Sequence, residues 1–284
     1  MSVTASEARK QLFPLIEKVN NDRIAVEITS RRGNAVLLSA EEFAALEETA
    51  YLLDLCWDRA EPLVVTGAMR PPQHAGADGP ANLLASVATA AASQMRDAGV
   101  LVVLDDEVHA AARVRKTDST ALHAFTSPAT GPLARVVERE PVVLSRRDRP
   151  GALPTPDPGT PVRVGLLESS LDDRADLVRL LVSQGYDGLV LAAFGVGHVS
   201  DATAEAVSDV AHQVPVVVAS RTGAGSTLTW TYGFTGSESD LLARGAVLSG
   251  WLDARKSRVL LWALLSLGRD AGEIAEEFRR RGRP

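Results

Sequence analysis

Apolar residues near the start of the chain switch from helical to strand-like spacing. From about residue 5 to 19 they recur three or four positions apart, which predicts a helix that Pro14 should kink. The spacing from Thr4 to Glu7 just before it is typical of a capping box. Two short apolar runs at 24–29 and 35–38 flank a turn-forming segment and predict a hairpin.

Further along, short buried strands alternate with longer amphipathic helices. Residues 39–42 repeat the capping-box spacing, which predicts the start of a helix that extends at least to Leu53. The following strands are expected at 63–66, 99–104, 162–167, 188–191 and 214–218, with helices at 82–95, 172–184 and 201–212. This alternation favours a parallel sheet with helices on its faces.

The predicted organisation is an α/β chain in four parts. Residues 1–53 form a small βαββα head, and residues 54–144 form a doubly wound parallel sheet domain. The proline-rich stretch 145–161 cannot pack as a helix or a central strand, so we expect it to be a linker. Residues 162–284 form a smaller C-terminal α/β domain.

Charge limits how this chain can bind nucleic acid. Its formal net charge of −6 argues against binding over the whole surface, so contact with DNA must come from a local basic face. Arg9 and Lys10 lie on the predicted first helix, and Arg31 and Arg32 lie at the predicted hairpin tip. Together they would form such a phosphate-binding face once two heads pair.

Other classes of protein and site are disfavoured. No apolar run reaches the roughly 20 residues of a membrane span, and the N-terminus lacks a signal-peptide pattern, so we expect a cytoplasmic protein with no membrane partner. The single cysteine, Cys56, is interpreted as structural. The five histidines lack metal-binding spacings, and we expect no metal and no cofactor.

The head carries four short motifs: Ser6–Arg9, Ile28–Gly33, Val36–Ser39 and Leu46–Leu53. Through them it resembles the Phd/YefM family of type II antitoxins. The resemblance implies a dimer that binds operator DNA, with Arg9 and Arg31 where the family contacts DNA and Lys10 and Arg32 beside them. It also implies a RelE/YoeB-type toxin as a candidate partner, although the flexible tail that wraps the toxin in this family is missing.

From about residue 47 to the C-terminus the chain resembles bacterial L-asparaginases of the asparaginase/glutaminase family. The matching motifs are Val64–Arg70, Ala77–Leu83, Asp106–Ala111, Arg113–Thr117, Gly195–Val199 and Tyr232–Glu238. The resemblance implies a homo-oligomer, a dimer or tetramer, that hydrolyses amides with a threonine nucleophile activated by a lysine and a second Thr-Asp pair. Lys116 occupies the position of that lysine. His198 and Glu238 match segments that a neighbouring subunit contributes to the pocket.

The family's earlier catalytic motifs are missing. The Thr-Gly-Gly-Thr-Ile-type turn, its lid tyrosine and the His-Gly-Thr-Asp-Thr motif do not occur, and Ser39–Phe43 stands where the Thr-Asp pair is expected. Because the parts of such a network act as a unit, we expect amidase activity to be impaired. The body is then a truncated asparaginase sheet that exposes an unpaired edge unless the head covers it. Leu46–Leu53 fits both families and marks the join.

The first hypothesis is therefore a DNA-binding, dimerising head on a catalytically impaired body, and two other functions remain open. A replacement nucleophile, such as Thr4 or Ser39, would make the chain a working asparaginase. Alternatively, the body sequesters a toxin through its contact surface, and the chain is an antitoxin in the full sense.

Overall fold

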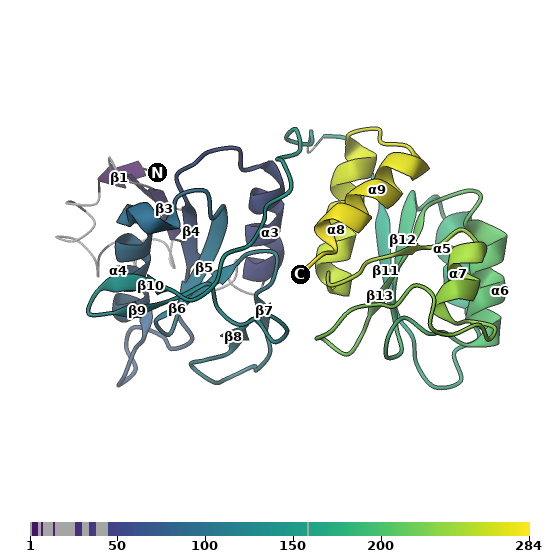
Figure 1. Cartoon of the computed structure of the whole chain (residues 1–284), viewed down its shortest axis with the longest axis horizontal. Coiled ribbons are helices and arrows are strands. Elements are labelled where there is room, and N and C mark those ends of the chain that lie inside the picture. The colour runs from purple at the N-terminus through teal and green to yellow at the C-terminus, as the bar shows by residue number, and fades with distance from the viewer. Residues whose placement is uncertain are drawn as a thin grey trace. The chain divides into compact units, whose positions relative to one another are not determined.

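The computed structural model describes residues 2–4, 7, 14, 26–29, 34–37, 45–157 and 159–284. The chain divides into two compact units, Met1–Leu153 and Pro154–Pro284 (Figure 1). The boundary between them falls inside the stretch predicted as a linker. Among the described residues, no helix combines the length and the apolar character needed to cross a membrane.

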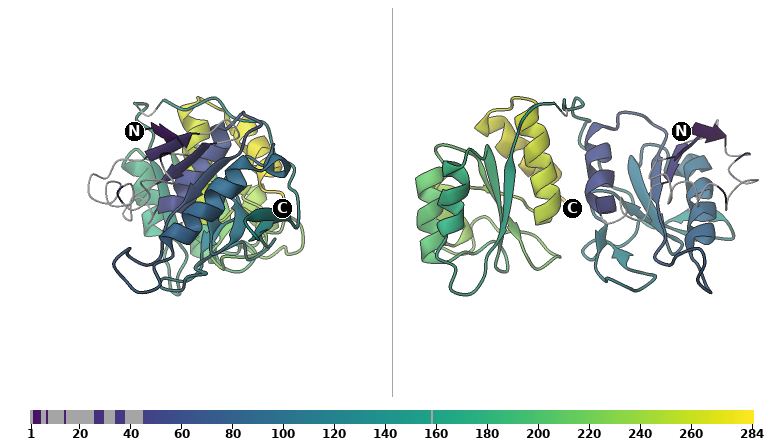
Figure 2. Two further views of the ribbon diagram at one scale, coloured as in Figure 1. Left: turned by 90° about the vertical axis from the view of Figure 1, so that its left-hand side faces the viewer. Right: turned by 180° about the vertical axis from the view of Figure 1, so that it is seen from behind.

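The first unit is built on a mixed sheet whose described strands number eight (Figures 1 and 2). Their order across the sheet is β1-β2-β3-β4-β5-β6-β9-β10. The strands are β1 (Ser2–Thr4), β2 (Val26–Thr29), β3 (Asn34–Leu37), β4 (Leu63–Thr66), β5 (Val100–Leu104), β6 (Glu107–Ala110), β9 (Ala134–Val137) and β10 (Glu140–Val143). A separate two-stranded sheet pairs β7 (Arg115–Lys116) with β8 (Phe125–Thr126).

The strands of the head belong to the same sheet as those of the body. β2 and β3 pair antiparallel, which confirms the predicted hairpin. β3 then pairs in parallel with β4, with Asn34 opposite Leu63 and Leu37 opposite Thr66. The head therefore covers the edge of β4 that would otherwise be unpaired.

The predicted parallel sheet is only part of what the structure contains. The pairs β3–β4 and β4–β5 are parallel, but β5–β6, β6–β9 and β9–β10 are antiparallel. Asp105 and Asp106 between β5 and β6 have φ values of 51° and 58°, and Glu138 and Arg139 between β9 and β10 have values of 50° and 70°. Two consecutive residues with positive φ are typical of tight hairpin turns, which reverse the chain without a crossover helix.

Two helices cover opposite faces of this sheet (Figures 1 and 2). The side chains of Val64, Leu101 and Val103 pack with α4 (Gly79–Ala91) and the short 3-10 helix η2 (Ser93–Met95). The alternate residues Val65 and Val102 pack with α3 (Leu46–Cys56). This two-residue alternation sends successive side chains to opposite faces, so a strand buried on both sides is apolar throughout.

The second unit has helices on both faces of a four-stranded parallel sheet in the order β11-β12-β13-β14 (Figure 1). The strands are β11 (Val164–Glu168), β12 (Gly188–Ala193), β13 (Val216–Ser220) and β14 (Val247–Leu248). The helices are α5 (Asp176–Ser183), α6 (Asp201–Val210), α7 (Glu238–Ala243), α8 (Ala254–Ser266) and α9 (Ala271–Arg281). The predicted strands and helices of this unit are confirmed, with ends shifted by a few residues.

The head can be compared with its prediction at only a few points. The capping box is confirmed, because Glu7 N donates to Thr4 Oγ1 at 3.2 Å and Thr4 N donates to a carboxylate oxygen of Glu7 at 2.9 Å. Glu7 and Pro14 are both helical. The rest of the predicted first helix, and the start of the second one at 39–44, lie outside the described residues.

Candidate functional site

Lys116 lies beside the beginning of α3. Its backbone N–H donates to Oε2 of Glu47 at 2.9 Å, and its Nζ lies 5.8 Å from the centre of the Phe125 ring on the paired strand. Glu47 is buried in the first turn of the helix, where the helix dipole favours a carboxylate. The predicted lysine is therefore held at the junction of β7, β8 and α3.

A hydrogen-bonded unit shapes the loop that follows β4. Asp78 accepts hydrogen bonds from the backbone N–H groups of Met69 and Arg70, both at 2.9 Å. Asn82 donates to the carbonyl of Gly67 at 3.0 Å and accepts from Asp105 N at 3.0 Å. Two motifs that the sequence analysis matched separately, 64–70 and 77–83, thus form one structure. Sequence reasoning gave no role to Asp78 or Asn82, although an Asp before a Gly-Pro helix start is a recognisable signal.

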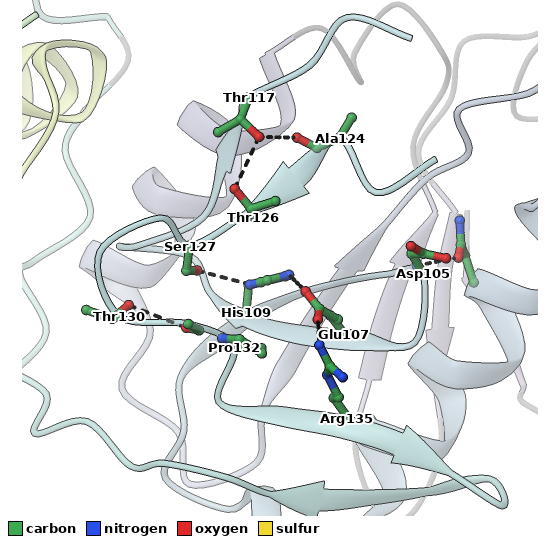
Figure 3. A network of polar contacts seen from close by, with 12 residues as sticks. Asp105, Glu107, His109, Thr117, Ala124, Thr126, Ser127, Thr130, Pro132 and Arg135 are labelled. Atoms are coloured by element: carbon green, nitrogen blue, oxygen red, sulfur yellow. Dashed lines mark hydrogen bonds and ion pairs between the residues drawn. The ribbon is translucent and has the colours of Figure 1, made fainter. Parts of the chain in front are cut away.

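The described hydroxyl groups near Lys116 are engaged with the protein. Thr117 Oγ1 donates to the carbonyl of Ala124 at 3.2 Å and lies 3.1 Å from Thr126 Oγ1 (Figure 3). Thr66 at the end of β4 is buried and donates to the carbonyl of Val103 at 2.6 Å. Thr117 and Thr126 are not flanked by glycine, and Thr66, which precedes Gly67, has its hydroxyl bonded inside the protein. None of the three is displayed as a free hydroxyl on a glycine turn, where the backbone can approach a bound substrate closely.

A second polar network lies nearby and has the composition Ser-His-Glu. His109 Nδ1 is 3.0 Å from Ser127 Oγ, and His109 Nε2 is 3.3 Å from Glu107 Oε2. Figure 3 shows Ser127 and Glu107 at opposite ends of the imidazole, with Arg135 donating to Glu107 at 2.6 Å. The His109 side chain is fully buried and Ser127 is 5% exposed. Burial lowers the pKa of His109 to about 4, against a smaller raising effect of Glu107. A substrate carbonyl has no approach to such an imidazole, so we interpret this network as structural.

His198 and Glu238 meet in the second unit. His198 Nε2 lies 3.0 Å from Glu238 Oε2, and the imidazole packs edge-on against the rings of Tyr232 and Phe234 at 5.0 and 4.9 Å. Burial by itself would raise the pKa of Glu238, but hydrogen bonds from Tyr232 N, other backbone N–H groups and His198 lower it overall. The structure thus brings together two residues that come from separate sequence motifs.

Of the remaining predicted site residues, the structure describes only Thr4. Arg9, Lys10, Arg31 and Arg32 lie outside the described residues, and so does Ser39. Thr4 lies on the edge strand β1, where its hydroxyl donates to Glu7 at 2.6 Å. Figure 1 shows β1 on the far side of the first unit from β7, which carries Lys116. Within the described part of the chain, no group of three or more His, Cys, Asp or Glu side chains is arranged to hold a metal ion.

Comparison with known proteins identifies the body. Residues 43–149 match the asparaginase N-terminal family, and residues 163–278 match the glutaminase/asparaginase C-terminal domain. A Haemophilus influenzae protein named "Probable L-asparaginase periplasmic" is 34% identical over 281 residues, covering 95% of this chain and 78% of that protein. The chain belongs to the asparaginase/glutaminase family. L-asparaginase 2 of Escherichia coli is 33% identical to it over 246 residues, covering 82% of this chain and 67% of the relative.

The head matches a second family. Residues 1–56 match the Phd_YefM antitoxin family of type II toxin-antitoxin systems. The antitoxin YefM of Streptomyces coelicolor is 66% identical over 53 residues, which make up 19% of this chain and 61% of that antitoxin. The chain is therefore an antitoxin-like head fused to an asparaginase-family body, as the motifs predicted.

Proposed function

We propose that the head of this chain dimerises and binds operator DNA, and that its asparaginase-family body does not hydrolyse asparagine by the family's threonine mechanism. The observation that carries the first half is the 66% identity to an antitoxin over 53 residues. Residues 1–56, which match the antitoxin family, contain the four basic residues Arg9, Lys10, Arg31 and Arg32. Paired in a dimer, eight such side chains supply the charge that phosphate contacts need.

The impaired body is supported by what surrounds Lys116. The lysine is retained, but the sequence lacks the Thr-Gly-Gly-Thr-Ile-type turn whose threonine it would activate. The described hydroxyls close to it, on Thr117 and Thr126, bond to each other, and Thr117 also bonds to a backbone carbonyl. Strand β3, which carries head sequence, occupies the place beside β4 in the sheet. Losing a nucleophile from such a network lowers the rate by several powers of ten.

A gel-shift experiment tests the DNA-binding half. We expect the full chain to shift operator-type DNA at low salt, where electrostatic binding is strongest. The double variant Arg9→Ala with Arg31→Ala should lose the shift, whereas Arg283→Ala, a matched change at an exposed C-terminal arginine, should keep it. No shift by the unaltered chain at low salt rejects the proposal.

A turnover assay tests the second half. Ammonia release from asparagine should stay at the background of the buffer, and circular dichroism of the same sample should show a folded protein. The competing function is a working asparaginase with a replacement nucleophile, favoured by the retained body motifs. Ammonia release that Lys116→Ala abolishes would establish that alternative.

The partners of the head are part of the same proposal. We propose a homodimer through the head and a RelE/YoeB-type toxin as the candidate protein partner. The body then takes the place of the missing toxin-binding tail. Rescue of growth against a co-expressed toxin of this type tests the idea, and continued growth arrest removes toxin neutralisation from the proposal while leaving DNA binding in place.

A further inference from the structure

Three arginines gather around one carboxylate in the first unit. Asp54 on α3 accepts hydrogen bonds from Arg147 Nη2 at 3.0 Å, from Arg149 Nη2 at 3.4 Å and from Val100 N at 3.0 Å. Arg113 lies close enough for the charges of Arg147 and Asp54 to affect it. We call Asp54, Arg113, Arg147 and Arg149 the arginine cluster.

The arginine cluster has more positive than negative charge. Its side chains are largely shielded from water, with exposed fractions of 7% for Asp54, 12% for Arg147 and 17% for Arg149. Guanidinium groups stay protonated in proteins, so three of them beside one carboxylate leave an excess of positive charge. Uncompensated charge in a poorly hydrated place is costly, and a bound anion removes that cost.

Arg113 has two buried donors without an acceptor in the described part of the chain. Its Nε and Nη1 are buried and have no hydrogen-bond partner among the described residues. Burial, followed by the charge of Arg147, lowers the pKa of Arg113 to about 10, while Tyr51 and Asp54 raise it. Buried guanidinium nitrogens are normally bonded, and the planar fork of arginine matches the oxygens of phosphate and carboxylate groups.

The other two arginines have a structural task that Arg113 does not share. Arg149 also donates to the carbonyl of Trp57 at 2.9 Å, and Leu153 N donates to the carbonyl of Leu55 at 2.7 Å. These bonds, together with those that Arg147 and Arg149 donate to Asp54, fasten the segment after β10 to α3, although Nε of Arg149 is also buried without a partner among the described residues. They leave the charge and the donors of Arg113 unexplained.

We propose that Arg113, together with Arg147, binds a small oxyanion: a free phosphate or the carboxylate of a small metabolite. The anion supplies the missing acceptor for Arg113 and balances the arginine cluster. Binding requires no metal and no covalent step. The residues of this site are different from Lys116 and from the four basic residues named for DNA binding.

Calorimetric titration of the full chain with sodium phosphate tests the proposed anion site. Sodium acetate is titrated in a second series, and sodium chloride at equal ionic strength is the control. We expect saturable binding of phosphate or acetate, and the stronger of the two identifies the class of anion. Arg113→Met should weaken that binding at least about tenfold. Its free energy of unfolding without the anion should not fall, because the substitution removes an unbalanced charge.

Two further variants separate this site from others. Arg113→Lys keeps the charge but loses the fork, so it should bind the anion more weakly than the unaltered chain and more strongly than Arg113→Met. Arg146→Met, at an exposed neighbour of Arg147, should bind as the unaltered chain does. Absence of saturable binding, or equal binding by Arg113→Met and the unaltered chain, overturns the proposal.

Discussion

The buried imidazole of His109 should make the stability of the first unit depend on pH. The folded chain keeps this histidine neutral down to a pKa of about 4, whereas the unfolded chain protonates it near the ordinary value of 6.5. The unfolded state therefore binds the extra proton as the pH falls between these values, and stability is lost. A depression of this size corresponds to at most about 3 kcal/mol, of which about 2 kcal/mol should be lost between pH 7.5 and 5.

Urea unfolding of the full chain at several pH values measures this loss. His109→Gln removes the titrating group, so the stability difference between the unaltered chain and this variant should shrink by about 2 kcal/mol from pH 7.5 to pH 5. His123→Gln, at an exposed histidine, is the matched control substitution. A difference that stays constant with pH would mean that Glu107 keeps His109 charged in the folded state, and would refute the reasoning.

Three further expectations can be checked on the same material. Gly99 and Gly131 both have left-handed φ values, 80° and 72° respectively. A Cβ added at Gly99 would lie 2.3 Å from Arg149 Nε, whereas a Cβ added at Gly131 would meet nothing within 4 Å. Gly131→Ala should cost about 1–2 kcal/mol and Gly99→Ala clearly more; equal losses in urea unfolding would contradict this. Asp253 caps α8 and forms an ion pair with buried Lys256 at 3.3 Å, so Asp253→Ala should lower the free energy of unfolding by about 3 kcal/mol. Asp270 belongs to the exposed capping box of α9, so Asp270→Ala should lower it by only about 1 kcal/mol. Thermal unfolding ranks the two, and the reverse order rejects the argument. For DNA binding, eight phosphate contacts per dimer predict a slope of roughly −7 for log affinity against log salt; a flat plot excludes such contacts.

The sequence predicted the buried central strands β4 and β5 of the first unit and missed β6, β9 and β10. β4 and β5 are continuous apolar or β-branched runs buried on both faces, and they lie where the pattern placed them. β6 reads Glu-Val-His-Ala, and among its three buried residues the apolar Val108 is followed directly by the polar His109. The turns at 105–106 and 138–139 lack the glycine that usually marks a tight hairpin, so neither the strand nor the turn gave a clear signal.

Sequence motifs identified single residues of the candidate sites, but they did not predict which residues contact one another. Lys116, His198 and Glu238 were identified from motifs, because each motif is local in the sequence. The partner of Lys116, Glu47, lies 69 positions away, and His198 and Glu238 are separated by 40. Contacts across such separations depend on how strands and helices pack, which spacing within a motif does not encode.

The pairing of β3 with β4 means that the two parts of this fusion cannot be separated by cutting the chain at the border of the two families. A fragment starting after Leu37 would lack β3, so β4 would become an unpaired edge strand. All four residues of β4 are buried in the intact chain, which makes this edge apolar. Exposed apolar edge strands pair with one another and aggregate. An insoluble fragment would therefore reflect the loss of β3, and it would not show that the body is unable to fold in the intact chain. Experiments on either part are best done by substitution within the intact chain.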